Sequence, residues 1–101
     1  MHARLARYAI EPDRVDDAVE GFRDASREIS QLDGFRGGHI LVDYENGTLM
    51  TMTFWENRAA LEASDVRAAA ARQAAVRPSE GEVQSVSTYV VPFDLAEPDS
   101  R

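Results

Sequence analysis

Two runs of strand-forming residues flank the dipeptide Asn46-Gly47 within residues 37–56, GGHILVDYENGTLMTMTFWE. An Asn-Gly pair between two such runs is the strongest short-range signal for a β-hairpin. With a two-residue loop, the predicted cross-strand pairs are Tyr44 with Leu49, Val42 with Thr51, Ile40 with Thr53 and Gly38 with Trp55. A four-residue loop would shift these partners but keep the same side chains on each face, whereas a three-residue loop would exchange the faces.

Both faces of this hairpin are predicted to be buried, because each carries large apolar side chains. The residues of the pairs above share one face, since strand residues alternate sides. The other face carries Asp43 with Met50, Leu41 with Met52, and His39 with Phe54. One face needs a cover of helices, and the other needs a second sheet, which a chain of 101 residues must borrow. Gly38 has no side chain, so its predicted pairing with Trp55 leaves room beside the indole for packing or for a ligand.

Two further strands are predicted outside the hairpin. Residues 3–10 alternate loosely, with Arg4, Ala6, Tyr8 and Ile10 on one face. Residues 83–92 form the predicted last strand, with Val83, Ser85, Ser87, Tyr89 and Val91 on one side. The residues after it, 93–101, are acidic and interrupted by proline, which indicates a frayed tail or an arm that reaches a partner.

Two helices complete the predicted set. Apolar residues at three- and four-residue spacing predict an amphipathic helix of about five turns from Pro12 to Leu32, which Asp33-Gly34 ends. Gly21 is expected to weaken this helix by about 1 kcal/mol relative to alanine. The second helix is predicted over 58–76 with Asn57 as its cap. It is rich in alanine, so it can lie close to a sheet or leave a gap that a ligand fills.

The order strand, helix, strand, strand, helix, strand predicts an α+β fold of the ferredoxin-like βαββαβ type, with a four-stranded antiparallel sheet. Both helices would cover one face of that sheet. Because the opposite face is also apolar, two sheets are expected to stack face to face in a symmetric homodimer. We therefore expect one domain over residues 1–92 and a C-terminal tail or arm over 93–101.

Composition excludes several classes of function. The net charge is -7 and no basic patch interleaves with aromatic residues, so nucleic acid is a poor candidate partner. The chain has no cysteine and only two histidines, which argues against a metal site and agrees with a reducing compartment. The N-terminus lacks the apolar core of a signal peptide, and no run of residues is long enough to span a membrane. A cytoplasmic location is the simplest expectation.

Several segments together resemble the antibiotic biosynthesis monooxygenase (ABM) domain. They are Gly34-Phe35, the hairpin strands, the step Phe54-Trp55-Glu56-Asn57 into a helix with Ala60-Leu61, and the closing strand Ser87-Thr88-Tyr89-Val90-Val91. The resemblance covers about residues 3–92. It implies a dimeric α+β barrel in which each subunit has a pocket between its sheet and its helices. Members of this family include cofactor-free oxygenases that convert polycyclic phenols to quinones, haem-degrading enzymes, and proteins without known activity.

The haem-degrading branch of the family fits this sequence poorly. That branch pairs a tryptophan at the position of Trp55 with a histidine ten residues later and an asparagine in the first strand. Here the tenth residue after Trp55 is Asp65, and the first strand contains no asparagine. The resemblance therefore favours the phenol-oxidising branch, in which polar or basic groups around the pocket hold an ionised phenol and no cofactor or metal is expected.

We accordingly expect a cofactor-independent monooxygenase that acts on a small aromatic, polyketide-like substrate. The alternative is a non-catalytic module on the same scaffold that binds a small ligand or a partner. The candidate catalytic residues are Trp55, His39 and Tyr89, and the candidate substrate-binding residues are Arg4, Tyr8, Asn57 and Arg72. Trp55 could equally be a core residue and His39 a packing residue, although the neutral pKa range of histidine suits a base that takes a phenolic proton.

Overall fold

The computed structural model describes residues 1–99. Its strands are β1 (His2–Ala9), β2 (Phe35–Asp43), β3 (Thr48–Trp55) and β4 (Glu82–Val90). Its helices are α1 (Val15–Ile29), α2 (Arg58–Ala63) and α3 (Asp65–Val76), with short 3-10 turns η1 (Pro12–Arg14) and η2 (Arg77–Ser79). The strands form one antiparallel sheet in the order β2-β3-β1-β4, so the predicted ferredoxin-like α+β arrangement is confirmed.

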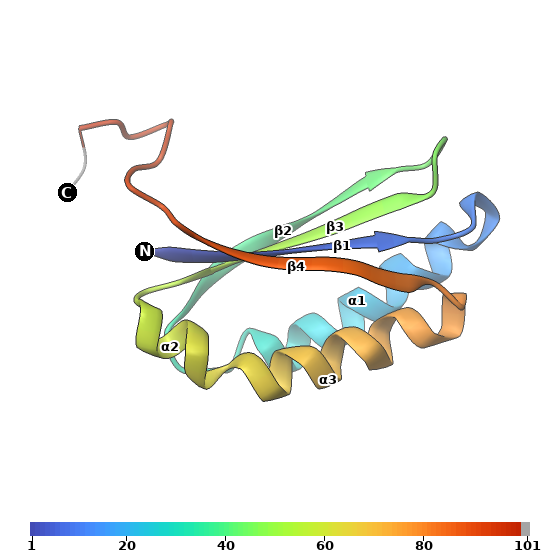
Figure 1. Ribbon diagram of the computed structural model, residues 1–101, viewed down its shortest axis with the longest axis horizontal. Coiled ribbons are helices and arrows are strands. Elements are labelled where there is room, and N and C mark those ends of the chain that lie inside the picture. The colour runs from blue at the N-terminus through green and yellow to red at the C-terminus, as the bar shows by residue number, and fades with distance from the viewer. Residues whose placement is uncertain (100–101) are drawn as a thin grey trace.

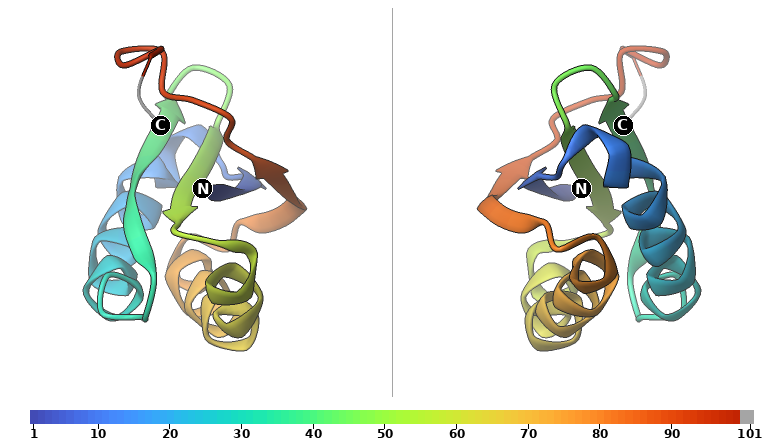
Figure 2. Two further views of the ribbon diagram at one scale, coloured as in Figure 1. Left: turned by 90° about the vertical axis from the view of Figure 1, so that its left-hand side faces the viewer. Right: turned by 90° about the vertical axis from the view of Figure 1, so that its right-hand side faces the viewer.

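All helices lie on one side of the sheet, which Figure 1 shows from the side and Figure 2 from both ends. The core fills the space between the two layers and is centred on the buried side chains of Tyr8, Val15, Phe22 and Leu49. Alternation along β1 is as predicted, since Arg4, Ala6 and Tyr8 are all buried on the helix side. The opposite face of the sheet, here called the outer face, has no helix over it (Figure 1).

The hairpin has a four-residue loop, so the two-residue loop predicted above is wrong. Asp43 pairs with Thr48, and Val42 pairs with Leu49. The Asp43 carboxylate accepts hydrogen bonds from the backbone N–H of Glu45 at 3.1 Å and of Asn46 at 3.2 Å. Of the loop residues, only Gly47 has a positive φ, 67°. The two-residue turn typical of Asn-Gly needs a positive φ at both residues. The faces are unchanged, because the side-chain period is two.

A β-bulge near the start of β2 changes the surroundings of Trp55. Phe35 pairs with Trp55 and Gly38 with Thr53, so the register shifts by one residue between them. Gly37 lies in the bulge with a φ of 107°, which suits a residue without a side chain. The predicted pairing of Gly38 with Trp55 is therefore wrong, and the space beside the indole is occupied by the ring of Phe35.

The second predicted helix is divided at Ser64 into α2 and α3. Asn57 caps α2 as predicted, because its side-chain oxygen accepts a hydrogen bond from the backbone N–H of Ala60 at 2.8 Å. At the division, the Ser64 hydroxyl donates to the carbonyl of Leu61 at 2.6 Å. Such local bonding by serine competes with the helical pattern and explains the break in an otherwise strong helix former.

The last strand contains a second irregularity, where the pairing of β1 with β4 shifts between Arg7 and Tyr8. Val83 pairs with Tyr8 and packs against the core, so it lies on the helix side. This contradicts the prediction that Val83 shares a face with Tyr89, because the shift interrupts the alternation between them. After β4 the Val91 N–H donates to the Met1 carbonyl at 2.8 Å, and Asp94 forms an isolated bridge with Glu97. The division into a domain over 1–92 and a tail over 93–101 stays a prediction, and residues 100–101 of that tail lie outside the described residues.

Candidate ligand-binding site

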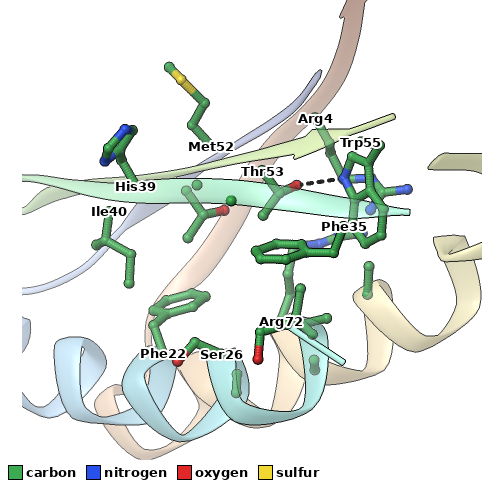
Figure 3. Close-up of a pocket in the computed structure, with 18 of the residues that line it drawn as sticks. Arg4, Phe22, Ser26, Phe35, His39, Ile40, Met52, Thr53, Trp55 and Arg72 are labelled. Atoms are coloured by element: carbon green, nitrogen blue, oxygen red, sulfur yellow. Dashed lines mark hydrogen bonds between the residues drawn. The ribbon is translucent and has the colours of Figure 1, made fainter. Parts of the chain in front are cut away.

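A cavity of about 550 Å³ lies between the sheet and the helices α1 and α3. Its volume is within the range of small-molecule sites. Its lining is mostly apolar. One residue of β1 and several residues of each of α1, β2, β3 and α3 line the cavity (Figure 3). The small side chains Ala25, Ala68 and Ala71 leave the space open, as the alanine content of the second helix suggested.

Three aromatic rings border the cavity. Trp55 is fully buried, and its indole N–H donates to the Thr53 hydroxyl at 3.0 Å. Phe35 meets the indole edge to face, with ring centroids 5.5 Å apart. Phe22 of α1 lies below the sheet on the opposite side of the space (Figure 3). These rings form walls against which a planar apolar molecule could pack.

Arg4 is a buried cation at one end of the cavity and is held by the corner between α2 and α3. Its guanidinium donates to the Leu61 carbonyl at 2.9 Å and to the Ser64 hydroxyl at 3.1 Å. It also forms an ion pair with Asp65, whose carboxylate is mostly exposed. The guanidinium carbon lies 5.8 Å from the Trp55 ring centroid. Arg4 therefore has a fixed position and a charge that Asp65 already balances.

Arg72 is the second cation of the lining, and its charge is not balanced in this way. It projects from α3 into the cavity beneath the sheet (Figure 3) and is partly buried. Among residues 1–99 no ion pair involves it. Burial lowers the pKa of the Arg72 guanidinium, and the positive charge of Arg4 lowers it further. Arginine nevertheless stays protonated at neutral pH, so the site contains a partly desolvated cation that an anion would stabilise.

His39 and Tyr89 do not reach this cavity with their side chains, although both were predicted to be catalytic. The ring of His39 points away from the helices, on the side of Met52, and packs against Phe54 with ring centroids 6.4 Å apart (Figure 3). Tyr89 pairs with Ala3 on the same outer face and is 52% exposed. Strand alternation explains both positions. The geometry of the chain gives no support to their predicted role in proton transfer.

Two of the predicted substrate-binding residues, Tyr8 and Asn57, do not line the cavity. Tyr8 is fully buried in the core, packs on Phe22 with ring centroids 4.8 Å apart, and shares a hydrogen bond with the Thr51 hydroxyl at 3.1 Å. Asn57 is exposed and is the cap of α2. Tyr8 and Tyr89 do not meet, because they lie on opposite faces of the sheet. Of the predicted site residues, the structure thus brings Trp55, Arg4 and Arg72 together.

Sequence reasoning missed Phe35 and the pair of Ser64 and Asp65. The glycines at 37 and 38 were a usable signal for Phe35, because adjacent glycines in a strand often mark a bulge, and a bulge turns the preceding side chains to the other face. No local signal connects Asp65 with Arg4, since sixty-one positions separate them in the chain. That contact arises only from the fold.

The polar atoms of the lining come from arginines and hydroxyls. Besides Arg4, Arg72 and Arg27, it contains Ser26, Ser30, Thr51 and Thr53. Within the described chain, no carboxylate side chain borders the cavity, and no group of three or more histidine, cysteine, aspartate or glutamate residues could hold a metal ion. The arrangement suits the binding of a planar molecule that carries a negative charge or several hydrogen-bond acceptors. Among the helices of residues 1–99, none is long and apolar enough to cross a bilayer.

Solved structures with the same fold are numerous, and their sequences are distant. A Deinococcus radiodurans protein described as an antibiotic biosynthesis monooxygenase superposes with a TM-score of 0.74 at 11% identity, over 94% of this chain and 96% of that chain. SnoaB, a cofactor-independent oxygenase from Streptomyces nogalater, gives a TM-score of 0.68 at 12% identity, over 93% of this chain and 95% of that chain. A Nitrosomonas europaea protein of the same description gives 0.70 at 11%, over 92% and 100%.

At these identities the structural likeness shows the fold alone. No curated protein has a significantly similar sequence. The family model for antibiotic biosynthesis monooxygenase, however, matches residues 1–81, which include every cavity-lining element. The chain therefore belongs to the antibiotic biosynthesis monooxygenase family.

Proposed function

We propose that this protein binds a small aromatic anion, of the kind formed by a polyketide-like phenol, and oxidises it with O₂ without a metal or flavin. The observation that carries the proposal is the combination of aromatic walls with the unbalanced cation of Arg72 in one cavity. A neutral hydrocarbon would use the walls but leave the guanidinium partly desolvated. An anionic ring system would use both, and charge-assisted hydrogen bonds to arginine are among the stronger polar contacts in proteins.

The same geometry suggests how such a reaction would proceed. Arg72, with Arg4 nearby, would favour the ionised form of a bound phenol. The proton would leave to water, because the arginines are already protonated and no carboxylate side chain borders the described cavity. The anion is electron-rich at ring carbon and can react with O₂ directly. When a ring CH₂ becomes a carbonyl, one oxygen atom enters the product and the other leaves as water with both hydrogens. Trp55 and Phe35 would hold the ring in place and exclude water.

Oxygen uptake tests the catalytic part of this proposal. The purified, metal-free protein should consume one O₂ for each quinone formed from 1,8-dihydroxyanthrone, at a rate above the reaction without protein. Arg72→Gln should lower that rate about tenfold or more, because it removes the charge that stabilises the anion. Arg67→Gln, an exposed position on the same helix, is the matched control and should behave as the unmodified protein. Uptake equal to spontaneous oxidation across a panel of polycyclic phenols would contradict the catalytic proposal.

A non-catalytic binding module is the second candidate. The described cavity has neither a carboxylate nor an inward-pointing histidine ring that could accept a proton, which favours this candidate. The two candidates differ in one measurement. Binding of an aromatic anion with no oxygen uptake would leave the binding module as the function, whereas uptake without added cofactor would support the oxygenase.

We also propose that two copies associate through the outer face of the sheet. Apolar side chains gather there on three of the four strands: Leu41 on β2, Met50, Met52 and Phe54 on β3, and Tyr89 on β4. Leu41 is 46% exposed and Tyr89 is 52% exposed. An apolar sheet face of this kind is ordinarily covered, and a second copy of the same face would cover it symmetrically.

A further inference from the structure

A second hollow, which we call the α1–β2 groove, extends from the cavity along the gap between α1 and β2. It has a volume of about 510 Å³. Val19, Arg23 and Ser26 form one side of it, and Ile40, Val42 and Tyr44 form the other. The groove and the cavity share four lining residues, namely Ser26, Gly38, His39 and Ile40. The two hollows are therefore continuous at these residues.

The local structure explains why this groove is open. Val19, Arg23 and Ser26 are spaced by four and three residues, so they form one stripe along α1. Ile40, Val42 and Tyr44 alternate along β2 and share its helix-facing side. β2 is an edge strand, and the helix does not cover it fully. Ile40 is 39% exposed and Tyr44 is 56% exposed, although both lie on the side that faces the helices.

The cavity has a closed end and an open end. Trp55 and Arg4 at the closed end are buried, whereas Ser26 and Gly38 at the junction with the groove are exposed. Gly38 must lack a side chain, because a Cβ there would come within 2.3 Å of the Met52 carbonyl oxygen. A ligand whose charged edge lies near the arginines would thus present its opposite edge to the groove.

We propose that the cavity's ligand has two parts: a planar anionic ring system in the cavity and an apolar chain that leaves at the junction and lies in the α1–β2 groove. This inference rests on the proposed binding of an aromatic anion and adds the chemistry of its far edge. Val19, Ile40 and Val42 provide apolar walls, and Arg23, paired with Glu20, lies at the border with water. Alternate strand residues are about 6.7 Å apart, so a chain of about six carbons that leaves beside Ile40 reaches Val42.

Three compounds test the inference in the unmodified protein by calorimetric titration. They are 3-hydroxy-2-naphthoate, its 6-hexyl derivative and its 4-hexyl derivative. The two hexyl compounds are equally hydrophobic, but only the 6-hexyl chain leaves from the edge opposite the carboxylate. We expect the 6-hexyl compound to bind about tenfold to hundredfold more tightly than the parent. Burial of one methylene increases affinity about fourfold, and an open groove covers the equivalent of about two or three of the six carbons. The 4-hexyl compound should gain little or lose affinity.

A variant within the groove provides the second test. Val42→Phe should fill the groove and remove the advantage of the 6-hexyl compound, while the parent keeps its affinity because Val42 does not line the cavity. The matched control is Val66→Phe, the same substitution at a side chain of α3 that is 83% exposed and lines neither the cavity nor the groove. Thermal unfolding and sedimentation of both variants would show that fold and association are unchanged.

The outcomes separate this inference from the proposed function. If the parent binds and the 6-hexyl compound binds no better than the 4-hexyl compound, the groove inference is overturned and anion binding stands. If only the 6-hexyl compound binds, and Val42→Phe abolishes this, the groove inference stands. Equal binding of the neutral compound 6-hexyl-2-naphthol would then overturn the anion proposal. If none of the three binds, both are overturned.

Discussion

Tyr8 is the residue whose chemistry the fold changes most clearly. Its ring is fully buried, and its hydroxyl shares a hydrogen bond with Thr51. Burial raises the pKa of the Tyr8 hydroxyl above the ordinary value of 10.0, and the hydrogen bond to Thr51 only partly offsets this. The folded protein thus holds the Tyr8 proton more tightly than the unfolded chain does. The contribution of this difference to the free energy of unfolding is present in full below pH 10.0.

We predict that this stability is lost as the pH rises above 10.0 through the raised pKa of Tyr8. Tyr8→Phe should lower the free energy of unfolding by about 1 kcal/mol at pH 8, through loss of the hydrogen bond, and should flatten its decline at alkaline pH. Urea unfolding between pH 8 and pH 11 measures both effects. Tyr89→Phe, at an exposed ring, is the control. Equal alkaline slopes for Tyr8→Phe and the unmodified protein would contradict the prediction.

Single residues also show what the sequence could and could not predict about the site. The pattern of β1 correctly placed Arg4 and Tyr8 on the same face of the sheet, because the two-residue period needs no knowledge of the fold. The same period already separated His39 from Trp55, and the structure keeps them on opposite faces. The balance of charge between Arg4 and Asp65 could not be predicted, since it depends on where the α2–α3 corner lies above β1.

At the scale of the elements, the close approach of α1 and α3 depends on Gly21. A Cβ on Gly21 would come within 2.1 Å of the carbonyl oxygen of Ala75. By helix propensity alone, alanine would stabilise α1 more than glycine does at this position. In the folded protein the contact between the helices dominates, because backbone atoms cannot move aside without moving the helix.

We predict that Gly21→Ala destabilises the protein by about 1–3 kcal/mol, the usual cost of overpacking, although alanine is the better helix former. Thermal unfolding followed by circular dichroism measures the change. Glu20→Ala, the adjacent exposed position, should stay within about 0.5 kcal/mol of the unmodified protein. A higher melting temperature for Gly21→Ala would show that the two helices do not approach as described.

The order and type of the elements could be predicted from sequence, because periodicity reflects which side chains must be buried. It identified each strand and both helical regions, although it gave one continuous helix where the structure has α2 and α3. The four-residue turn is stabilised by the Asp43 carboxylate, which also has its pKa lowered by its hydrogen bonds to Asn46 and Glu45. The bulge at Gly37 and the break at Ser64 have local signals, but their effect on the cavity depends on tertiary contacts, since Phe35 packs on Trp55 and Ser64 accepts a hydrogen bond from Arg4.

At the scale of the whole molecule, the outer face of the sheet leads to a prediction about association. The unmodified protein should sediment as a dimer at micromolar concentration, and Met52→Glu should sediment as a monomer, because a carboxylate in a buried apolar interface is strongly unfavourable. The control is Val66→Glu, which changes an apolar side chain that is 83% exposed on α3. A monomeric unmodified protein would contradict the proposed association.

The central claim is that the cavity selects aromatic molecules by their negative charge, and the single tryptophan allows a direct test. Quenching of Trp55 fluorescence at pH 7 should give a dissociation constant for 3-hydroxy-2-naphthoate at least about tenfold lower than for neutral 2-naphthol, as expected for a charge-assisted contact. Arg72→Gln should remove this difference and Arg67→Gln should preserve it. Equal affinities for the two compounds in the unmodified protein, or a charge preference that survives Arg72→Gln, would contradict the claim.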